Sequence, residues 1–401
     1  MNTKGFNPQK FLANRIQTIK PSGIRRFFDL AYQMDNVISL GVGEPDYVTP
    51  LNFREASILS LEKGYTAYSP NAGLIQLRKE IADYLYNKFD AKYSIENEIL
   101  VTVGSSEALD IAIRTIVNPG DEIIVIEPSY VSYSPIIEMA GGKVVTIQAL
   151  ANFDFKLQPE QLEKVITNKT KGIIICSPNN PTGTVLNRRD LKKIAEVIVK
   201  HNLLVLSDEI YSEISYDESF TSMVSIPGMQ ERTILMNGFS KGFAMTGWRL
   251  GFACGPSEII QGMLKVHQYS IMCAPTMSQF AAIEALKNGQ EQVRKMVQSY
   301  NDRRHYIVNE FNEMGLSCHL PGGAFYVFPD ISSTGLSSEE FAEKLLIDEQ
   351  VAVVPGSVFG KGGEGYIRCS YVTRFELLQE AMLRIKRFID KDLYNRKEVK
   401  I

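Results

Sequence analysis

The chain has 401 residues, of which 44% are hydrophobic and 22% are charged, and its formal net charge is −3 at pH 7. This composition is typical of a globular enzyme, and the length predicts two domains or one large α/β domain with an appendage. Because the chain has no basic excess, we expect neither nucleic acid nor an acidic membrane as a partner.

The cysteines, the histidines and the N-terminus exclude further classes of protein. Five scattered cysteines form no CxxC pair, and their odd number does not suit a disulfide framework, so we expect reduced thiols in a cytoplasmic protein. Residues 1–16 contain no apolar segment of a secretory signal, and no apolar run is long enough to span a membrane. The four histidines lie far apart without metal-ligand spacing, so we expect no metal site.

The first elements in chain order are an arm and a helix. We expect residues 1–45 to form an N-terminal arm that packs on the C-terminal part of the chain or on a partner subunit. Residues 105–117 have the apolar spacing of a helix, which begins after two candidate N-caps, Ser105 and Ser106.

The middle of the chain has the sequence pattern of a buried β-sheet. Its apolar runs are β-branched, continuous and bounded by turn residues, which is typical of strands buried on both faces of a parallel sheet. These runs are residues 122–128, 143–149, 172–178, 203–210, 233–240 and 250–256. Residues 187–202 predict an amphipathic crossover helix between two of them. We therefore predict a large α/β domain over residues 46–287, with a mostly parallel open sheet flanked by helices.

The pattern changes near residue 288. A long charged amphipathic helix is predicted over 291–315, and strand-like runs then mix with helices up to the C-terminus. The strand-like runs are residues 323–331, 351–356 and 365–372, with a helix at 337–349 and another at the end. This mixture predicts a smaller α+β domain over residues 288–401, completed by the N-terminal arm.

Polar and aromatic residues follow the predicted strands. Ligands of open α/β sheets bind outside the carboxyl ends of the strands, so we expect these residues to gather at one edge. They are Gly104, Ser105 and Ser106 after residues 98–103, Tyr130, Asn180, Tyr211 and Lys241. A small-residue turn that opens a helix suits an anion, although a plain N-cap would have the same local sequence.

Asp208 and Lys241 are two charged groups in apolar surroundings. A carboxylate at the end of a buried strand needs a cation or several donors to remain ionised. Lys241 or Arg249 could supply that cation in a structural ion pair, and a bound ligand could supply it as well. A lysine in such a segment is either paired from elsewhere or is not an ammonium.

Nine motifs in the chain resemble the class I aminotransferases of fold type I, which depend on pyridoxal phosphate. The three with the densest chemistry are SPNNPTG at 177–183, DEIY at 208–211 and SKGFAMTGWRLG at 240–251. The others are SLGVGEPDY, YTAYSPNAGLIQLR, TVGSSEALD, EPSYVSYSP, PGGAFYVF and YIRCSY, in that chain order. The resemblance extends from about residue 21 to residue 385 and is strong because the motifs keep the family order.

The resemblance implies catalytic roles for three residues. Lys241 is similar to the lysine that binds the pyridoxal aldehyde covalently and later moves a proton as a base. Asp208 would face the pyridine nitrogen and keep it protonated, and Tyr211 would bond to the phenolate oxygen of the ring together with Asn180. Tyr130 would stack on the face of the ring.

The resemblance also implies how the ends of the ligands are held. Arg249 would bind the cofactor phosphate as a fork, with further donors from Ser105, Ser106 and Ser240 and close approach at Gly104. Arg368 would bind the α-carboxylate of the substrate, beside Gly43 and Asn180. Tyr68 resembles the tyrosine that reaches the phosphate of the neighbouring subunit's cofactor. Some relatives carry a phosphate-binding serine where this chain has Gly238, so that contact must come from elsewhere.

The resemblance implies a homodimeric aminotransferase that works by a ping-pong mechanism. It would move an amino group from an L-amino acid, aromatic, aspartate-like or related, to a 2-oxo acid, with 2-oxoglutarate as the expected acceptor. Arg25 or Arg26 in the arm could approach a substrate side chain, or could simply be solvated. Two alternatives remain at this stage: a C–S β-lyase with the same cofactor and fold, and a non-enzymatic regulator that retains the pocket.

Overall fold

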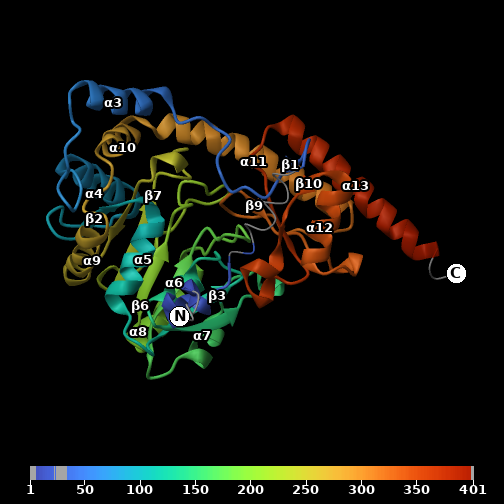
Figure 1. Cartoon of the computed structure of the whole chain (residues 1–401), viewed down its shortest axis with the longest axis horizontal. Coiled ribbons are helices and arrows are strands. Elements are labelled where there is room, and N and C mark those ends of the chain that lie inside the picture. The colour runs from blue at the N-terminus through green and yellow to red at the C-terminus, as the bar shows by residue number, and fades with distance from the viewer. Residues whose placement is uncertain (1–5, 22, 24–33, 399–401) are drawn as a thin grey trace, which may run out of the picture.

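The computed structural model of the chain describes residues 6–21, 23 and 34–398. Arg25 and Arg26 lie outside the described residues. A large twisted sheet lies in the left half of the molecule in Figure 1, and the helices of the C-terminal part lie together on the right.

The central sheet has seven strands in the order β2-β8-β7-β6-β5-β3-β4. Its strands are β2 (Ile99–Thr102), β3 (Glu122–Glu127), β4 (Lys143–Gln148), β5 (Thr170–Cys176), β6 (Leu204–Asp208), β7 (Thr233–Gly238) and β8 (Gly251–Cys254). Strands β4, β3, β5, β6 and β7 run parallel, whereas β8 is antiparallel to both of its neighbours. The predicted mostly parallel α/β sheet is therefore confirmed.

Successive side chains of the central strands enter cores on opposite faces of the sheet. In β5, Ile174 packs with the residues of one core, whereas Ile173 and Ile175 pack in another. Both cores exclude water, which explains why these strands read as continuous apolar runs. Strand β4 is different because it lies at the edge, and Ile147 is its one buried residue. The expectation that all six runs are buried on both faces is wrong for this strand.

Helices cover both faces of the sheet (Figure 1). The helices of this part of the chain are α3 (Leu51–Glu62), α4 (Ile75–Phe89), α5 (Gly104–Ile116), α6 (Tyr133–Met139), α7 (Pro159–Val165), α8 (Arg188–Lys200), α9 (Ser257–Ser270) and α10 (Thr276–Asn288). Helix α3 packs against α10. Asn187 caps α8 through a reciprocal capping box with Asp190. Helix α5 has no side-chain cap, because its N-cap is Val103. The prediction that Ser105 and Ser106 cap this helix is therefore wrong: both lie within its first turn.

The C-terminal part of the chain has its own small sheet and long helices. Its helices are α11 (Gln290–Glu313), α12 (Ser338–Glu349) and α13 (Phe375–Glu398), and its strands are β9 (Tyr326–Val327), β10 (Val351–Ala352), β11 (Val354–Pro355) and β12 (Ile367–Ser370). Strands β11, β12 and β9 form a three-stranded antiparallel sheet. The strands are shorter than the apolar runs that predicted them, because turns and 3-10 segments interrupt those runs.

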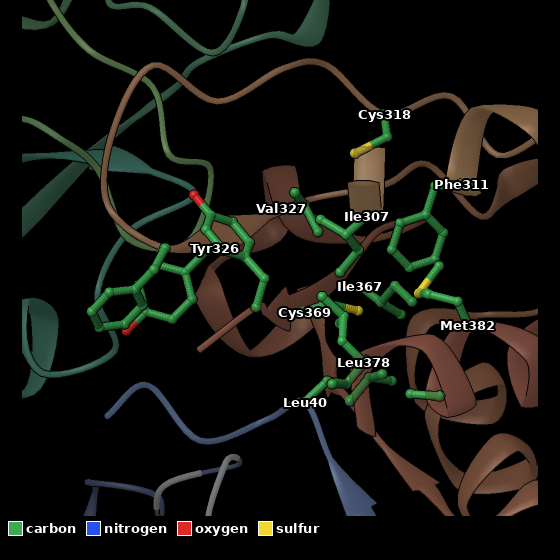
Figure 2. Close-up of a cluster of buried hydrophobic side chains, with 14 of the residues drawn as sticks. Leu40, Ile307, Phe311, Cys318, Tyr326, Val327, Ile367, Cys369, Leu378 and Met382 are labelled. Atoms are coloured by element: carbon green, nitrogen blue, oxygen red, sulfur yellow. The ribbon is translucent and has the colours of Figure 1, made fainter. Parts of the chain in front are cut away.

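The N-terminal segment contacts both parts of the chain: residues 14–17 lie against α6, and residues 38–40 join the C-terminal part. After the short helices η1 (Pro8–Phe11) and α1 (Asn14–Gln17), strand β1 (Ile38–Ser39) pairs in parallel with β10. Leu40 then enters the core formed by α11, α13 and the small sheet, where it lies near Leu378 and Cys369 (Figure 2). The division of the chain at residues 45 and 287 stays a prediction.

Among the described residues, no helix combines the length and the apolar character that crossing a bilayer requires.

Candidate active site

A cavity of about 360 Å³ lies where the carboxyl ends of the central strands meet the small sheet. This volume suits a small organic ligand. Eleven residues predicted from the sequence line it: Gly43, Ser105, Ser106, Tyr130, Asn180, Asp208, Tyr211, Ser240, Lys241, Arg249 and Arg368. They come from segments that are far apart in the chain, so the fold itself assembles the site.

Lys241 follows β7 and projects into the cavity. Its Nζ donates to the carbonyl oxygen of Gly43 over 2.6 Å and lies 5.9 Å from the ring centre of Phe325. The pKa of the Lys241 amine is lowered to about 8, chiefly by burial; the charge of Glu44 acts against this shift, whereas the positive charges of Arg368 and Arg249 add to it. A neutral amine is thus accessible near neutral pH, as a nucleophile or base requires.

Asp208 ends β6 at the floor of the cavity. Its Oδ2 accepts from the phenol of Tyr133 over 2.7 Å, and its Oδ1 accepts from the backbone N–H of Ile210 over 3.3 Å. Burial raises the pKa of the Asp208 carboxyl, and these two donors lower it. No cation of the described residues pairs with this carboxylate, so the alternative of an ion pair with Lys241 or Arg249 is not seen. A ligand cation would complete its environment.

An anion cradle lies at the start of α5. A Cβ atom added to Gly104 would lie 2.7 Å from Nη2 of Arg249, so only glycine lets the guanidinium come this close to the turn. Gly104 also has a φ of +75°, which glycine adopts without strain. Ser105, Ser106 and Ser240 line the same end of the cavity. Together with the helix N-terminus, these donors suit a phosphate or a comparable anion.

Gly238, where some relatives carry a serine, is enclosed by backbone. A Cβ atom at this position would lie 3.0 Å from the carbonyl oxygen of Leu250 and 3.1 Å from Cα of Gly251. A side chain would therefore require the paired strands to shift.

Arg368 of β12 is almost completely buried at the other end of the cavity. Its Nη1 donates to Oδ1 of Asn180 over 2.8 Å, and its Nη2 donates to the carbonyl oxygen of Gly41 over 2.6 Å. The guanidinium lies 4.4 Å from the ring centre of Tyr326 and 4.9 Å from that of Phe359. Two rings and two acceptors hold its plane, which is the arrangement that bidentate binding of a carboxylate needs.

Tyr211 lies between these groups and is also buried. Its Oη is 2.8 Å from Oη of Tyr326, and burial raises the pKa of its phenol. Both phenols therefore remain protonated donors at neutral pH. The hydroxyl of Tyr326 closes over Gly43, where no side chain would fit.

The structure does not bring Tyr68 to the cavity of its own chain. Its side chain is 82% exposed, in the turn between α3 and α4. The neighbouring backbone is held in place, because Oγ1 of Thr276 donates to the carbonyl oxygen of Ala67 over 3.1 Å. Tyr68 is thus presented outward on an anchored turn.

The cavity includes residues that sequence reasoning missed. They are Gly41, Val42, Tyr133, Cys176, Ile210, Thr246 and Tyr326. Tyr133 and Tyr326 are the two whose contacts matter most, and both stand within motifs quoted above, EPSYVSYSP and PGGAFYVF. Their position in those motifs could have indicated a role in the site. Their hydrogen-bond partners, Asp208 and Tyr211, come from other elements of the chain.

Comparison with known proteins points to the same family as the motifs of the chain. Residues 35–385 match the model of the family described as aminotransferase class I and II. The chain is 61% identical over 381 residues to YugH of Bacillus subtilis (strain 168), which is named as an aminotransferase; the match covers 95% of this chain and 99% of that one. It is 45% identical over 381 residues to an aspartate aminotransferase of Pyrococcus abyssi, with 94% and 98% covered.

A solved structure of an aminotransferase is also similar to this chain. An aromatic aminotransferase from Pyrococcus horikoshii matches with a TM-score of 0.87 at 44% identity, over 92% of this chain and 99% of that chain. These likenesses do not favour the regulator alternative, since the relatives are named aminotransferases. The chain belongs to the class I and II aminotransferases.

Proposed function

We propose that the chain binds pyridoxal 5′-phosphate in this cavity and uses it to move amino groups between amino acids and 2-oxo acids. The observation that carries the proposal is the combination of three groups in one cavity. Lys241, an amine of lowered pKa, lines the same cavity as Arg249 of the anion cradle and Asp208, a buried carboxylate that pairs with no cation among the described residues. A phosphate, an aldehyde and a ring nitrogen are the matching features of this cofactor.

Each part of the cofactor has residues that would hold it. Arg249, Ser105, Ser106 and Ser240 would bind the phosphate, Asp208 the ring nitrogen, Tyr211 and Asn180 the phenolate oxygen, and Tyr130 the ring face. When bound, the cofactor would delocalise the electron pair that stays on the substrate's α-carbon when its proton is removed. Asp208, ionised through the donors Tyr133 and Ile210, would keep the ring nitrogen positive.

The remaining residues would act on the substrate. Arg368 would bind the α-carboxylate as a fork, which positions the α-carbon near Lys241. Lys241 would hold the cofactor covalently between reactions and, once released by the substrate, would move the proton to and from the α-carbon. Gly43 leaves room for the carboxylate because it has no side chain.

The covalent role of Lys241 can be tested directly. The purified protein should be yellow, and borohydride reduction should fix the cofactor to the peptide that contains Lys241, as read by mass spectrometry. Lys241→Ala should abolish both the labelling and turnover. A variant that keeps full turnover would refute the assignment.

We propose a ping-pong transfer with 2-oxoglutarate as the acceptor. The relatives described above are named aminotransferases, and this does not favour the C–S β-lyase alternative. An amino acid alone should convert the enzyme once to its amine form, and 2-oxoglutarate should restore the original absorbance. Steady release of pyruvate and ammonia from a cysteine-type substrate, without an oxo acid, would instead support the lyase.

We propose that the amino-group donor is an aromatic, aspartate-like or related L-amino acid. One relative is named for aspartate and one for aromatic substrates. A panel of L-amino acids with 2-oxoglutarate, followed by product analysis, would rank aromatic, aspartate-like and other donors. A preference for none of them would leave the mechanism intact and change the substrate class alone.

We also propose that the chain forms a homodimer with shared sites. Large apolar side chains are exposed in the chain before Tyr68, namely Val48, Leu51, Ile58, Leu59 and Tyr65. Others are exposed in the segment whose Met272 carbonyl accepts from Asn71, namely Tyr269, Ile271 and Met272. A surface of this kind is typical of a protein interface. We further propose a cytoplasmic location, which the five unpaired cysteines support.

A further inference from the structure

A buried carboxylate–imidazole pair lies behind the anion cradle. Oε1 of Glu107, in the first turn of α5, is 2.6 Å from Nδ1 of His267 in α9. The imidazole is completely buried, and the Glu107 side chain is only 10% exposed. Since an ionised carboxylate can only accept, Nδ1 carries the hydrogen and donates it.

The second oxygen of Glu107 holds the turn itself. Oε2 accepts from the backbone N–H of Val103, the residue that precedes Gly104. Val103 is the N-cap of α5 and its apolar side chain cannot cap the helix. The Glu107 carboxylate therefore fastens the junction between strand and helix, together with the Thr102 hydroxyl, which donates to the carbonyl oxygen of Gly104 over 2.9 Å. His267 orients the Glu107 carboxylate from α9.

The position of Glu107 is notable for its charge. A carboxylate one residue after Ser106 would repel an anion bound at the same helix start, so a role in binding the anion directly is excluded by sign. Neither Glu107 nor His267 lines the cavity. The bond to Nδ1 of His267 keeps the carboxylate in the core between α5 and α9, away from the cradle.

We propose that Glu107 and His267 are positioning residues for the cofactor phosphate: they hold the turn from Val103 to Ser106 in the shape that binds it. The inference rests on the proposed function, since it takes the cradle to be the phosphate site. The close fit of Gly104 against Arg249 makes the cradle sensitive to a shift of this turn.

The test separates the phosphate from the rest of the cofactor. Apoenzyme is titrated with pyridoxal 5′-phosphate and, separately, with pyridoxal, which lacks the phosphate, and both affinities are read from absorbance. His267→Leu removes the donor, and we expect about a tenfold loss of affinity for pyridoxal 5′-phosphate, as for a lost hydrogen bond to a charged group. Affinity for pyridoxal should change less than about twofold, because the ring and Lys241 contacts remain.

Two further variants distinguish positioning from general damage. His267→Asn places an amide N–H near the Nδ1 position and should restore most of the phosphate-dependent affinity. His201→Leu is the matched control, because His201 forms a second histidine–glutamate pair, with Nε2 2.8 Å from Oε1 of Glu163, at the end of α8. This control should leave the ratio of the two affinities unchanged.

The affinities of His267→Leu for the two ligands either support or overturn the positioning role. Equal losses for both ligands, or no loss in His267→Leu, would overturn the inference. If that variant does not fold, Glu107→Ala tests the same contact from α5 and should also lose phosphate-dependent affinity; a retained or increased affinity would overturn the inference. If the wild-type protein itself binds both ligands equally, the proposed cofactor site fails. Inorganic phosphate should raise the melting temperature of the wild-type apoenzyme more than that of His267→Leu.

Discussion

The phenol of Tyr133, the first residue of α6, donates a hydrogen bond of 2.7 Å to Oδ2 of Asp208 at the end of β6. Both side chains are buried, and burial raises the pKa of each. The shared hydrogen bond acts against this effect for Asp208, because it stabilises the carboxylate. A short helix after β3 thus supports the charge of a residue on a different strand.

We predict that Tyr133→Phe lowers kcat about tenfold, the effect of losing roughly one hydrogen bond to a charged group. Without the donor, the carboxylate of Asp208 is less stable and holds the ring nitrogen's proton less well. Cofactor affinity should change little, since no cradle residue is altered. The measurement is turnover with a saturating amino-acid donor. Tyr84→Phe is a matched control, because this buried phenol donates to Glu213 and does not line the cavity.

A pH dependence follows from the amine of Lys241. Its pKa is lowered from 10.5 to about 8, so the neutral amine that attacks an aldehyde predominates above that pH. The rate at which apoenzyme captures pyridoxal 5′-phosphate should therefore rise with a midpoint near pH 8 and level off above about pH 9. Stopped-flow absorbance measures this rate.

The Glu44→Gln variant tests whether the charge of Glu44 raises the pKa of Lys241. The Glu44 carboxylate raises the pKa of Lys241, so its removal should move the midpoint of the capture profile to lower pH. A midpoint that moves upward, or a wild-type rate that is flat across this range, would contradict the electrostatic account of the site.

Much of the fold was accessible from the sequence because the central strands are buried on both faces. Continuous β-branched runs such as residues 172–178 have few alternatives, and a polar residue after each run indicated where the strands end. The exceptions have local causes. Strand β4 is exposed because it lies at the sheet edge, and the caps of α5 were misassigned because Glu107, four residues on, holds the turn at Val103.

The contacts of the site were less accessible, since they join segments distant in the chain. Tyr326 and Tyr211 are separated by 115 residues, and Arg368 and Asn180 by 188. Motif resemblance named Tyr211, Asn180 and Arg368, but only the packing of the small sheet against the large one brings Tyr326 to them. Tyr68 illustrates a further limit, because a site that uses two chains cannot be completed from one.

Glu209 predicts a pH dependence of stability. Its side chain is buried beside Asp208, Oε1 accepts from Ser207, Ser222 and the N–H of Met223, and burial raises its pKa from 4.5 to about 7. The folded chain keeps this proton up to about pH 7, whereas the unfolded chain releases it near pH 4.5. The contribution of Glu209 to the free energy of unfolding should therefore fall by about 3 kcal/mol between these pH values and be level above them.

Glu209→Gln cannot lose a proton, so its stability should lack this fall. The difference between variant and wild-type apoenzyme should grow in the variant's favour from pH 4.5 to 7, whatever its value at pH 4.5. Urea denaturation at one fixed protein concentration measures it, because a dimer's stability depends on concentration. Parallel stability curves for the two proteins would show that Glu209 titrates at an ordinary pH.

The exposed Tyr68 leads to a prediction about subunit sharing. We expect Tyr68 to complete the phosphate site of a partner subunit, because it is 82% exposed and does not line the cavity of its own chain. In a closed two-fold dimer the same patch serves both subunits, so a residue given across the interface is also received. Two weakened variants make this measurable: Tyr68→Phe, assayed at limiting cofactor, and Lys241→Ala.

The two variants are unfolded and refolded together in equal amounts. If Tyr68 acts across the interface, a hybrid dimer has one site with both residues intact and one site with neither. Random pairing makes about half of the dimers hybrid, so roughly a quarter of all sites should recover full activity at limiting cofactor. If Tyr68 serves its own chain, no hybrid site has both residues, and the activity of the mixture stays at the average of the two parent variants. That second result would contradict the shared site, because Tyr68 would then have to act in the cavity of its own chain, which it does not line.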